Sequence, residues 1–101
     1  MPLASSGHKE FDQVLQDYVR MHKSKNHDYA NDDEPLANFI LQAEITGLSM
    51  DEVFFNMIAV KAARLKELIT GKTPNNESMD DTIIDMGVYS ALWAAWRKRA
   101  E

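Results

Sequence analysis

Hydrophobic residues recur at three- and four-residue spacing in four separate stretches of the chain. This spacing places the apolar side chains on one face of an α-helix. We therefore expect four helices, and no segment alternates in the way that predicts a β-strand. Because the connections between them are short, the simplest architecture is an all-α, antiparallel four-helix bundle with up-and-down connections. The expected helices span about residues 9–25, 36–46, 49–71 and 78 to near the C-terminus.

Local signals mark the ends of these helices. Ser49 and Glu52 have the spacing of a capping box at the start of the third helix, and Gly71 follows its last apolar residues. Pro35 suits the first turn of the second helix, which Gly47 closes. The polar segment 25–34 is expected to form a loop between the first two helices.

Lys61 interrupts the apolar face of the third helix, and Arg64 lies at the margin of the same face. A buried ammonium group requires an anionic partner, because losing its hydration shell is costly. The residues that share this face with Lys61 are Phe54, Met57, Ile58, Leu65 and Leu68.

The fourth helix carries the complementary charge pattern. Glu77, Asp81 and Asp85 recur at four-residue spacing and share a face with Val88 and Tyr89. Two interpretations are open. In the structural one, Lys61 and Arg64 form salt bridges with Asp81 and Asp85 between antiparallel helices. In the functional one, the three carboxylates hold Mg²⁺ while the two cations contact the phosphates of a ligand.

Other candidate residues lie outside these two helices. Lys25, Asp28 and Tyr29 are candidates for ligand binding from the polar segment after the first helix, and Asn38 of the second helix is a further one. Trp93 and Trp96 form an apolar surface on the fourth helix that either covers the core or joins a second subunit. We expect a homo-oligomer, because so short a bundle has apolar area to spare.

Composition narrows the classes of function. A chain of 101 residues forms one domain, with residues 1–8 expected to be a flexible leader and residues 9–101 a single helical domain. The absence of cysteine excludes thiol nucleophiles and disulfides. A net charge of −5 argues against nucleic-acid binding, and no apolar stretch predicts a membrane span or a signal peptide. We therefore expect a cytoplasmic protein.

Several of these residues form a pattern that resembles the nucleotide modification associated domain 1 family, small helical proteins that are frequent in bacteriophages. The resemblance covers roughly residues 18 to 93, and its most specific parts are the third and fourth segments. The segments are Lys25-x-x-Asp28-Tyr29, Asn38-Phe39, Lys61-x-x-Arg64-Leu65 and Glu77-Ser78-x-x-Asp81-Thr82-x-x-Asp85, followed by Tyr89. The resemblance implies a role in phage nucleotide chemistry, in the cytoplasm of the host cell.

The chain also resembles, more distantly, the MazG-like all-α nucleoside triphosphate pyrophosphatases. Those enzymes bind Mg²⁺ through helical carboxylates and release pyrophosphate. This second resemblance implies a MazG-like bundle in which Glu77, Asp81 and Asp85 bind Mg²⁺ and Lys61 assists catalysis together with Asp81 and Asp85. Arg64, Tyr89 and the candidates of the first two segments would then bind the substrate.

The departure from the MazG-like pattern leaves the activity open. Where those enzymes carry an acidic motif on the partner helix, this chain has Lys61 and Arg64. The first hypothesis is a Mg²⁺-dependent nucleotide pyrophosphohydrolase. The alternatives are a protein that binds or sequesters a nucleotide without hydrolysing it, and an acidic module that docks on a host protein.

Overall fold

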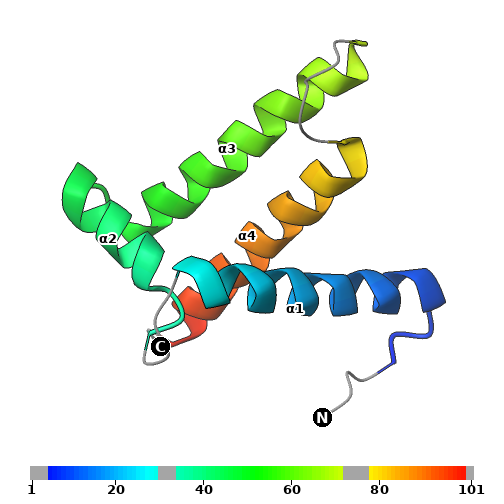
Figure 1. The fold of residues 1–101 in the computed structure, drawn as a ribbon, viewed down its shortest axis with the longest axis horizontal. Helices are drawn as coiled ribbons and strands as arrows, with labels where there is room; N and C mark the ends of the chain where they lie inside the picture. Colours follow the sequence, from blue (N-terminus) through cyan, green and yellow to red (C-terminus); the bar gives the residue numbers. More distant parts are fainter. Residues whose placement is uncertain (1–4, 30–33, 72–77, 100–101) are drawn as a thin grey trace.

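The computed structural model describes residues 5–29, 34–71 and 78–99, with the side chains of residues 25–29 left out of the description. All regular secondary structure in these ranges is helical, which confirms the predicted all-α class with four helices (Figure 1). The packing of the helices is consistent with a bundle. The helices are α1 (Lys9–Tyr29), α2 (Ala37–Thr46), α3 (Met50–Ile69) and α4 (Met79–Arg99).

Helix α1 is longer than predicted, because it runs to Tyr29 rather than ending near Lys25. The prediction that residues 25–29 begin a loop is therefore wrong. The segment is polar, but it contains neither glycine nor proline, and its Asn, His and Asp residues each disfavour a helix by only about 0.7 kcal/mol or less. An existing helix readily continues through residues of this kind.

The capping box of α3 and the glycine that ends α2 are confirmed, whereas Pro35 lies before Leu36, the N-cap residue of α2, and not in the first turn of the helix. The Ser49 side chain accepts a hydrogen bond from the Glu52 backbone N–H (3.1 Å), and the Glu52 carboxylate accepts one from the Ser49 backbone N–H (3.0 Å). Gly47 ends α2 with a φ of 73°, a left-handed conformation that glycine adopts without steric cost. At the start of α4, Ser78 caps the helix by accepting a hydrogen bond from the Asp81 N–H (3.1 Å).

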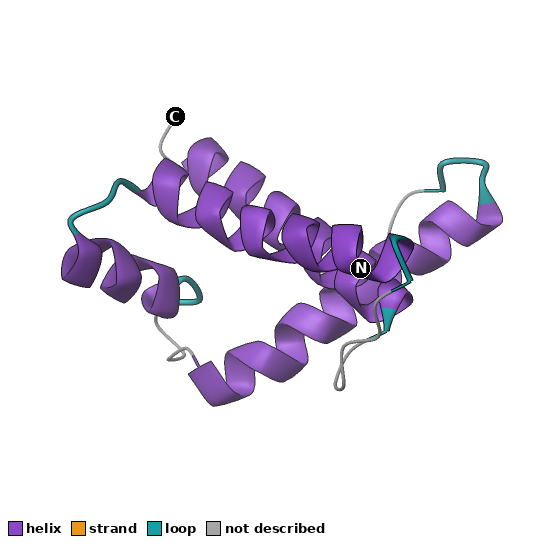
Figure 2. Ribbon diagram, turned by 90° about the horizontal axis from the view of Figure 1, so that it is seen from above, coloured by secondary structure: helices purple, strands orange, loops and turns teal. Residues whose placement is uncertain are grey.

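The helices pack in three pairs. α3 and α4 run antiparallel and form the most extensive pair, α2 packs on α3, and α1 packs on α4. Figures 1 and 2 show that α1 crosses α4 instead of running alongside it. Among the described residues, no helix is long and apolar enough to span a membrane.

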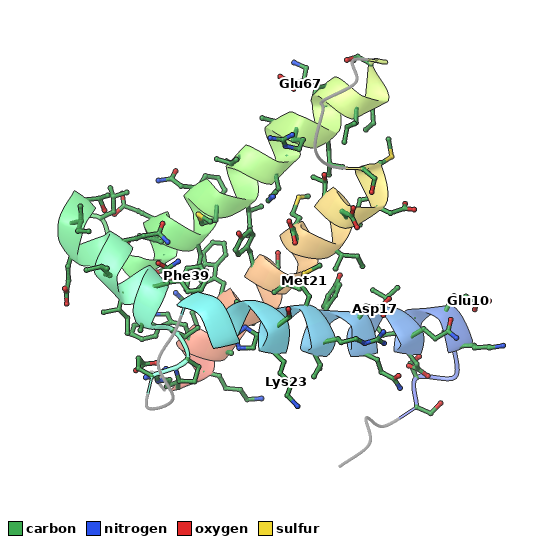
Figure 3. All side chains as sticks on the ribbon, viewed as in Figure 1. Glu10, Asp17, Met21, Lys23, Phe39 and Glu67 are labelled. Atoms are coloured by element: carbon green, nitrogen blue, oxygen red, sulfur yellow. The ribbon has the colours of Figure 1, made fainter. Side chains whose placement is uncertain are left out.

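The buried core lies where α2, the first half of α3 and the second half of α4 meet. The Phe39 ring stacks on the Phe54 ring at 4.7 Å between centroids, and the Phe54 ring stacks on the Trp93 ring at 6.3 Å. Figure 3 shows Phe39 directed into this junction. Trp93 and Trp96 pack against the buried cluster of Leu36, Phe39, Val53 and Phe54. The two tryptophans thus cover the core, as one of the two interpretations of the sequence predicted.

The crossing of α1 over α4 depends on Gly87, which lies under the Tyr18 side chain. A Cβ atom at position 87 would come within 1.9 Å of the Tyr18 hydroxyl oxygen and 2.2 Å of the ring carbon that bears it. Both distances are far shorter than a van der Waals contact. The absence of a side chain at Gly87 therefore lets the two helices approach closely at this point.

We expect Gly87→Ala to weaken the packing of α1 on α4. Overpacking costs about 1 to 3 kcal/mol, which outweighs the gain of about 1 kcal/mol from the higher helix propensity of alanine. In a Tyr18→Ala background the clash is absent, so the same substitution should raise the free energy of unfolding. Urea denaturation of the four proteins of this double-mutant cycle measures both effects. Equal effects in the two backgrounds would contradict the assigned contact.

Candidate functional site

The central feature of the α3/α4 pair is a buried ion pair between Lys61 and Asp85. The Lys61 Nζ atom lies 3.0 Å from the Asp85 Oδ2 atom. The Lys61 side chain is 17% exposed and the Asp85 side chain 9% exposed. At this distance and degree of burial the interaction is only weakly screened by solvent and salt. Of the pairings that the sequence suggested, this one is present in the described structure.

Thr82 is a second buried polar residue of α4, one turn before Asp85. It is fully buried, and its hydroxyl donates a hydrogen bond to the backbone carbonyl of Ser78 (2.8 Å). The bond satisfies a hydroxyl that would otherwise be costly to bury. The sequence analysis did not single out Thr82 as a buried residue. The sequence signal for its burial was its spacing of three residues from Asp85 and of six from Val88, both of which are buried.

Asp81, in contrast, is exposed. The four-residue spacing still places Asp81 on the side of α4 that carries Asp85 and Val88, about 40° and 20° from them around the helix axis. The two carboxylates differ in their position along the helix, because Asp81 lies in the first turn of α4 and Asp85 lies one turn further on. Thr82, Asp85 and Val88 are the buried residues of α4, and Asp85 is the buried carboxylate among the described residues.

The remaining candidates differ in where the structure places them. Arg64 is half-buried one turn after Lys61, and Tyr89 is half-buried one turn after Asp85, with its ring edge-on to Phe39 at 6.1 Å. Asn38 is exposed on α2 beside Phe39. Three candidates (Lys25, Asp28 and Tyr29) belong to the last turns of α1, but their side chains lie outside the described part of the structure, as does all of Glu77.

The described residues do not by themselves make a site for Mg²⁺. Within the ranges that the structure describes, no three His, Asp or Glu side chains group closely enough to hold a metal ion. Asp85 is bonded to the ammonium group of Lys61, and Asp81 is exposed. Because Glu77 lies outside the described residues, binding of Mg²⁺ stays a prediction from the sequence.

A second set of charged contacts lies around Asp51, between the first turn of α3 and the C-terminal half of α4. The Asp51 carboxylate accepts hydrogen bonds from the Trp93 indole N–H (2.7 Å) and from the Arg97 guanidinium (3.0 Å). The indole bond, and then the Arg97 bond, hold the pKa of Asp51 below its usual value. These contacts fasten the C-terminal half of α4 to the start of α3. The sequence reasoning missed them, because an acidic residue in the first turn of a helix is common.

Glu34, which precedes α2, takes part in a similar contact with the last turn of α4. Its carboxylate accepts hydrogen bonds from the Arg99 guanidinium, which lowers the pKa of Glu34. The guanidinium carbon of Arg99 also lies 5.5 Å from the centroid of the Trp96 ring. If the protein is an acidic module that docks on a host protein, the acidic segment 32–34 is a candidate for the contact. Its one described member is thus engaged within the chain.

The geometry assigns the candidate site to the Lys61–Asp85 layer, with Arg64 and Tyr89 one turn away on either helix. The resemblances to nucleotide modification associated domain 1 proteins and to MazG-like enzymes stay predictions from the motif residues. Comparisons of the chain with protein-family models, with curated proteins and with solved structures found no match.

Proposed function

We propose that this protein binds a nucleotide or nucleotide-like ligand at the Lys61–Asp85 layer and belongs to the nucleotide chemistry of a phage. One observation carries the proposal. The two most specific segments of the family resemblance, on α3 and α4, meet through the 3.0 Å contact between Lys61 and Asp85. Residues that are 24 positions apart in the sequence therefore contribute to one polar layer between the two helices.

The chemistry of this layer suits a phosphate group. Asp85 holds the Lys61 ammonium in a fixed place, and Arg64 follows about 4.5 Å further along the helix axis. A guanidinium group binds two phosphate oxygens at once, and an ammonium group serves as a compact point charge beside it. In this proposal Lys61 and Arg64 contact the phosphates, and Tyr89 stacks on or hydrogen-bonds the base. Lys25, Asp28, Tyr29 and Asn38 contribute further contacts.

Hydrolysis is the second candidate function, and it requires more than the described residues supply. A pyrophosphohydrolase of the MazG-like kind needs several carboxylates that converge on Mg²⁺. The described part of α4 offers Asp85, which is bonded to Lys61, and Asp81, which is exposed. The described side chains thus support binding without turnover better than they support catalysis.

The proposal predicts that a nucleotide raises the midpoint of thermal unfolding. A ligand present at about 100 times its dissociation constant stabilises the folded state by roughly 2.7 kcal/mol. For a domain of this size that corresponds to a rise of roughly 10 °C or more. The measurement is a thermal unfolding series with nucleoside mono-, di- and triphosphates, with and without Mg²⁺. Each ligand is recovered afterwards and analysed by chromatography.

Two variants of α3 make the test specific. Arg64→Gln should remove most of the rise, whereas Lys66→Gln removes a cation from the exposed side of the same helix and should leave the rise intact. Recovery of an unchanged ligand supports binding without turnover. Recovery of a nucleoside monophosphate with pyrophosphate, only when Mg²⁺ is present, establishes the hydrolase instead. No rise with any nucleotide contradicts the proposed function.

A further inference from the structure

One side of α3 carries a row of five apolar residues, three of them exposed and two (Ile58 and Leu65) half-buried. The row is spaced by three and four residues alternately, which is the pattern of a helix that packs along a partner helix. Phe55 is 62% exposed and Ile69 is 71% exposed, although both are large hydrophobic residues. The α3 row consists of Phe55, Ile58, Ala62, Leu65 and Ile69.

Helix α4 carries a matching row, again at alternating four- and three-residue spacing. Its first two members, Met79 and Ile83, are 38% and 46% exposed. Neither the α3 row nor the α4 row contains a charged residue. The α4 row consists of Met79, Ile83, Met86, Ser90 and Trp93.

The two rows lie on the same side of the α3/α4 pair. The Phe55 ring contacts the Trp93 ring at one end, with 6.5 Å between their centroids. Because α3 and α4 are antiparallel and Lys61 is opposite Asp85, Ile69 comes opposite Met79 at the other end. Helix α1 packs on a different side of α4, since Tyr18 lies on Gly87, which is about 80° around the helix axis from the middle of the α4 row. The two rows together form a largely apolar face, here called the hairpin face, in which Ser90 is polar and Trp93 is shared with the core.

The hairpin face has the form that a second copy of the chain requires. In the α3 row, small Ala62 lies at the centre with two bulky residues on each side. The row therefore has nearly the same profile when it is reversed. An antiparallel copy would place Ala62 against Ala62 of the partner subunit on a twofold axis, where small side chains allow the helices to approach closely. An interface of this kind, in which the same patch serves both subunits, is the usual arrangement in homodimers.

The exposed area of the chain is also sufficient for such an interface. Each partner in a typical stable interface buries approximately 800 Å². A face that spans two helices of 20 and 21 residues, each about 30 Å long, is large enough to provide this area.

We propose that the hairpin face is the interface of a symmetric homodimer, in which the α3/α4 pairs of two copies pack against each other as a four-helix layer. The α1 and α2 helices lie outside this layer. The Lys61–Asp85 pair points between α3 and α4 of its own chain, so the dimer does not depend on the proposed nucleotide binding.

Analytical ultracentrifugation of the full chain at micromolar concentration tests the dimer. The unmodified chain should sediment with twice the mass of one chain. Ala62→Glu in the α3 row and Ile83→Glu in the α4 row should each shift it to one chain mass, because each places a charge within a desolvated interface. The matched control is Val60→Glu on α3, an exposed apolar position (61%) that lies outside both rows and should leave the dimer intact.

Circular dichroism of the same samples distinguishes loss of the dimer from loss of the fold. Retained helical signal in the two row variants shows that loss of the dimer is not loss of the fold. A monomeric unmodified chain overturns the proposal and leaves the hairpin face for a different protein partner. A dimer that survives both row substitutions, or one that Val60→Glu disrupts equally, overturns it as well.

Discussion

Asp85→Ala is expected to lower the free energy of unfolding by roughly 3 to 5 kcal/mol. The substitution leaves the Lys61 ammonium group, which is only 17% exposed, without the carboxylate that lies 3.0 Å away. A buried charge that loses its main counter-ion is among the most costly defects in a protein interior. Urea denaturation at neutral pH measures the change.

Asp81→Ala is the matched control for this prediction, because Asp81 is a carboxylate on the same helix but is exposed. Its effect should stay within about 0.5 kcal/mol. Replacing both partners, as in Lys61→Met with Asp85→Leu, should restore most of the lost stability, since neither charge of the pair is left buried without the other. Similar costs for Asp81→Ala and Asp85→Ala would show that the buried pair is not the feature that matters.

Phe54→Ala is expected to cost about 3 to 5 kcal/mol. The Phe54 side chain is fully buried, and it stacks on Phe39 from α2 and on Trp93 from α4. Its removal leaves a cavity at the point where three helices meet, and rigid aromatic neighbours fill such a cavity poorly. The loss should appear as a lower urea midpoint, together with weaker near-ultraviolet circular dichroism from Trp93.

Phe11→Ala serves as the control for the Phe54 substitution. It removes the same side chain from α1, where the residue is 51% exposed. Its cost should be well below that of Phe54→Ala, because less apolar area returns to water and no closed cavity forms. If the two substitutions cost the same, the assigned core is wrong.

The sequence predicted the helices well because their signals are local. The capping box at Ser49 and Glu52 and the left-handed glycine at position 47 act within a few residues, so they do not depend on the tertiary fold. The end of α1 was predicted less well, since a weakly unfavourable polar segment does not fix a boundary. Residues 25–29 illustrate this difference, because they continue α1 although they were expected to begin a loop.

The candidate site was predictable in part. An isolated Lys61 in an apolar stripe required a buried partner, and the spacing of α4 offered Asp85 as one of two carboxylates. Asp81 and Asp85 lie on the same side of α4, so the choice between them depended on how far α4 is shifted along α3, which tertiary packing decides. The bonds from Trp93 and Arg97 to Asp51 span more than 40 residues, so no local pattern could reveal them.

Nucleotide binding by the charge-free double variant tests the central claim most directly. Lys61→Met with Asp85→Leu should fold, yet it lacks the ammonium group and the carboxylate that we assign to the site. Isothermal titration calorimetry, with the nucleotide that best stabilises the unmodified protein, measures the dissociation constants of the unmodified protein and of the double variant. We predict that the unmodified protein binds the nucleotide and that the folded double variant binds it with at least a tenfold weaker affinity. Unchanged affinity would contradict this prediction and would make the Lys61–Asp85 pair a purely structural contact.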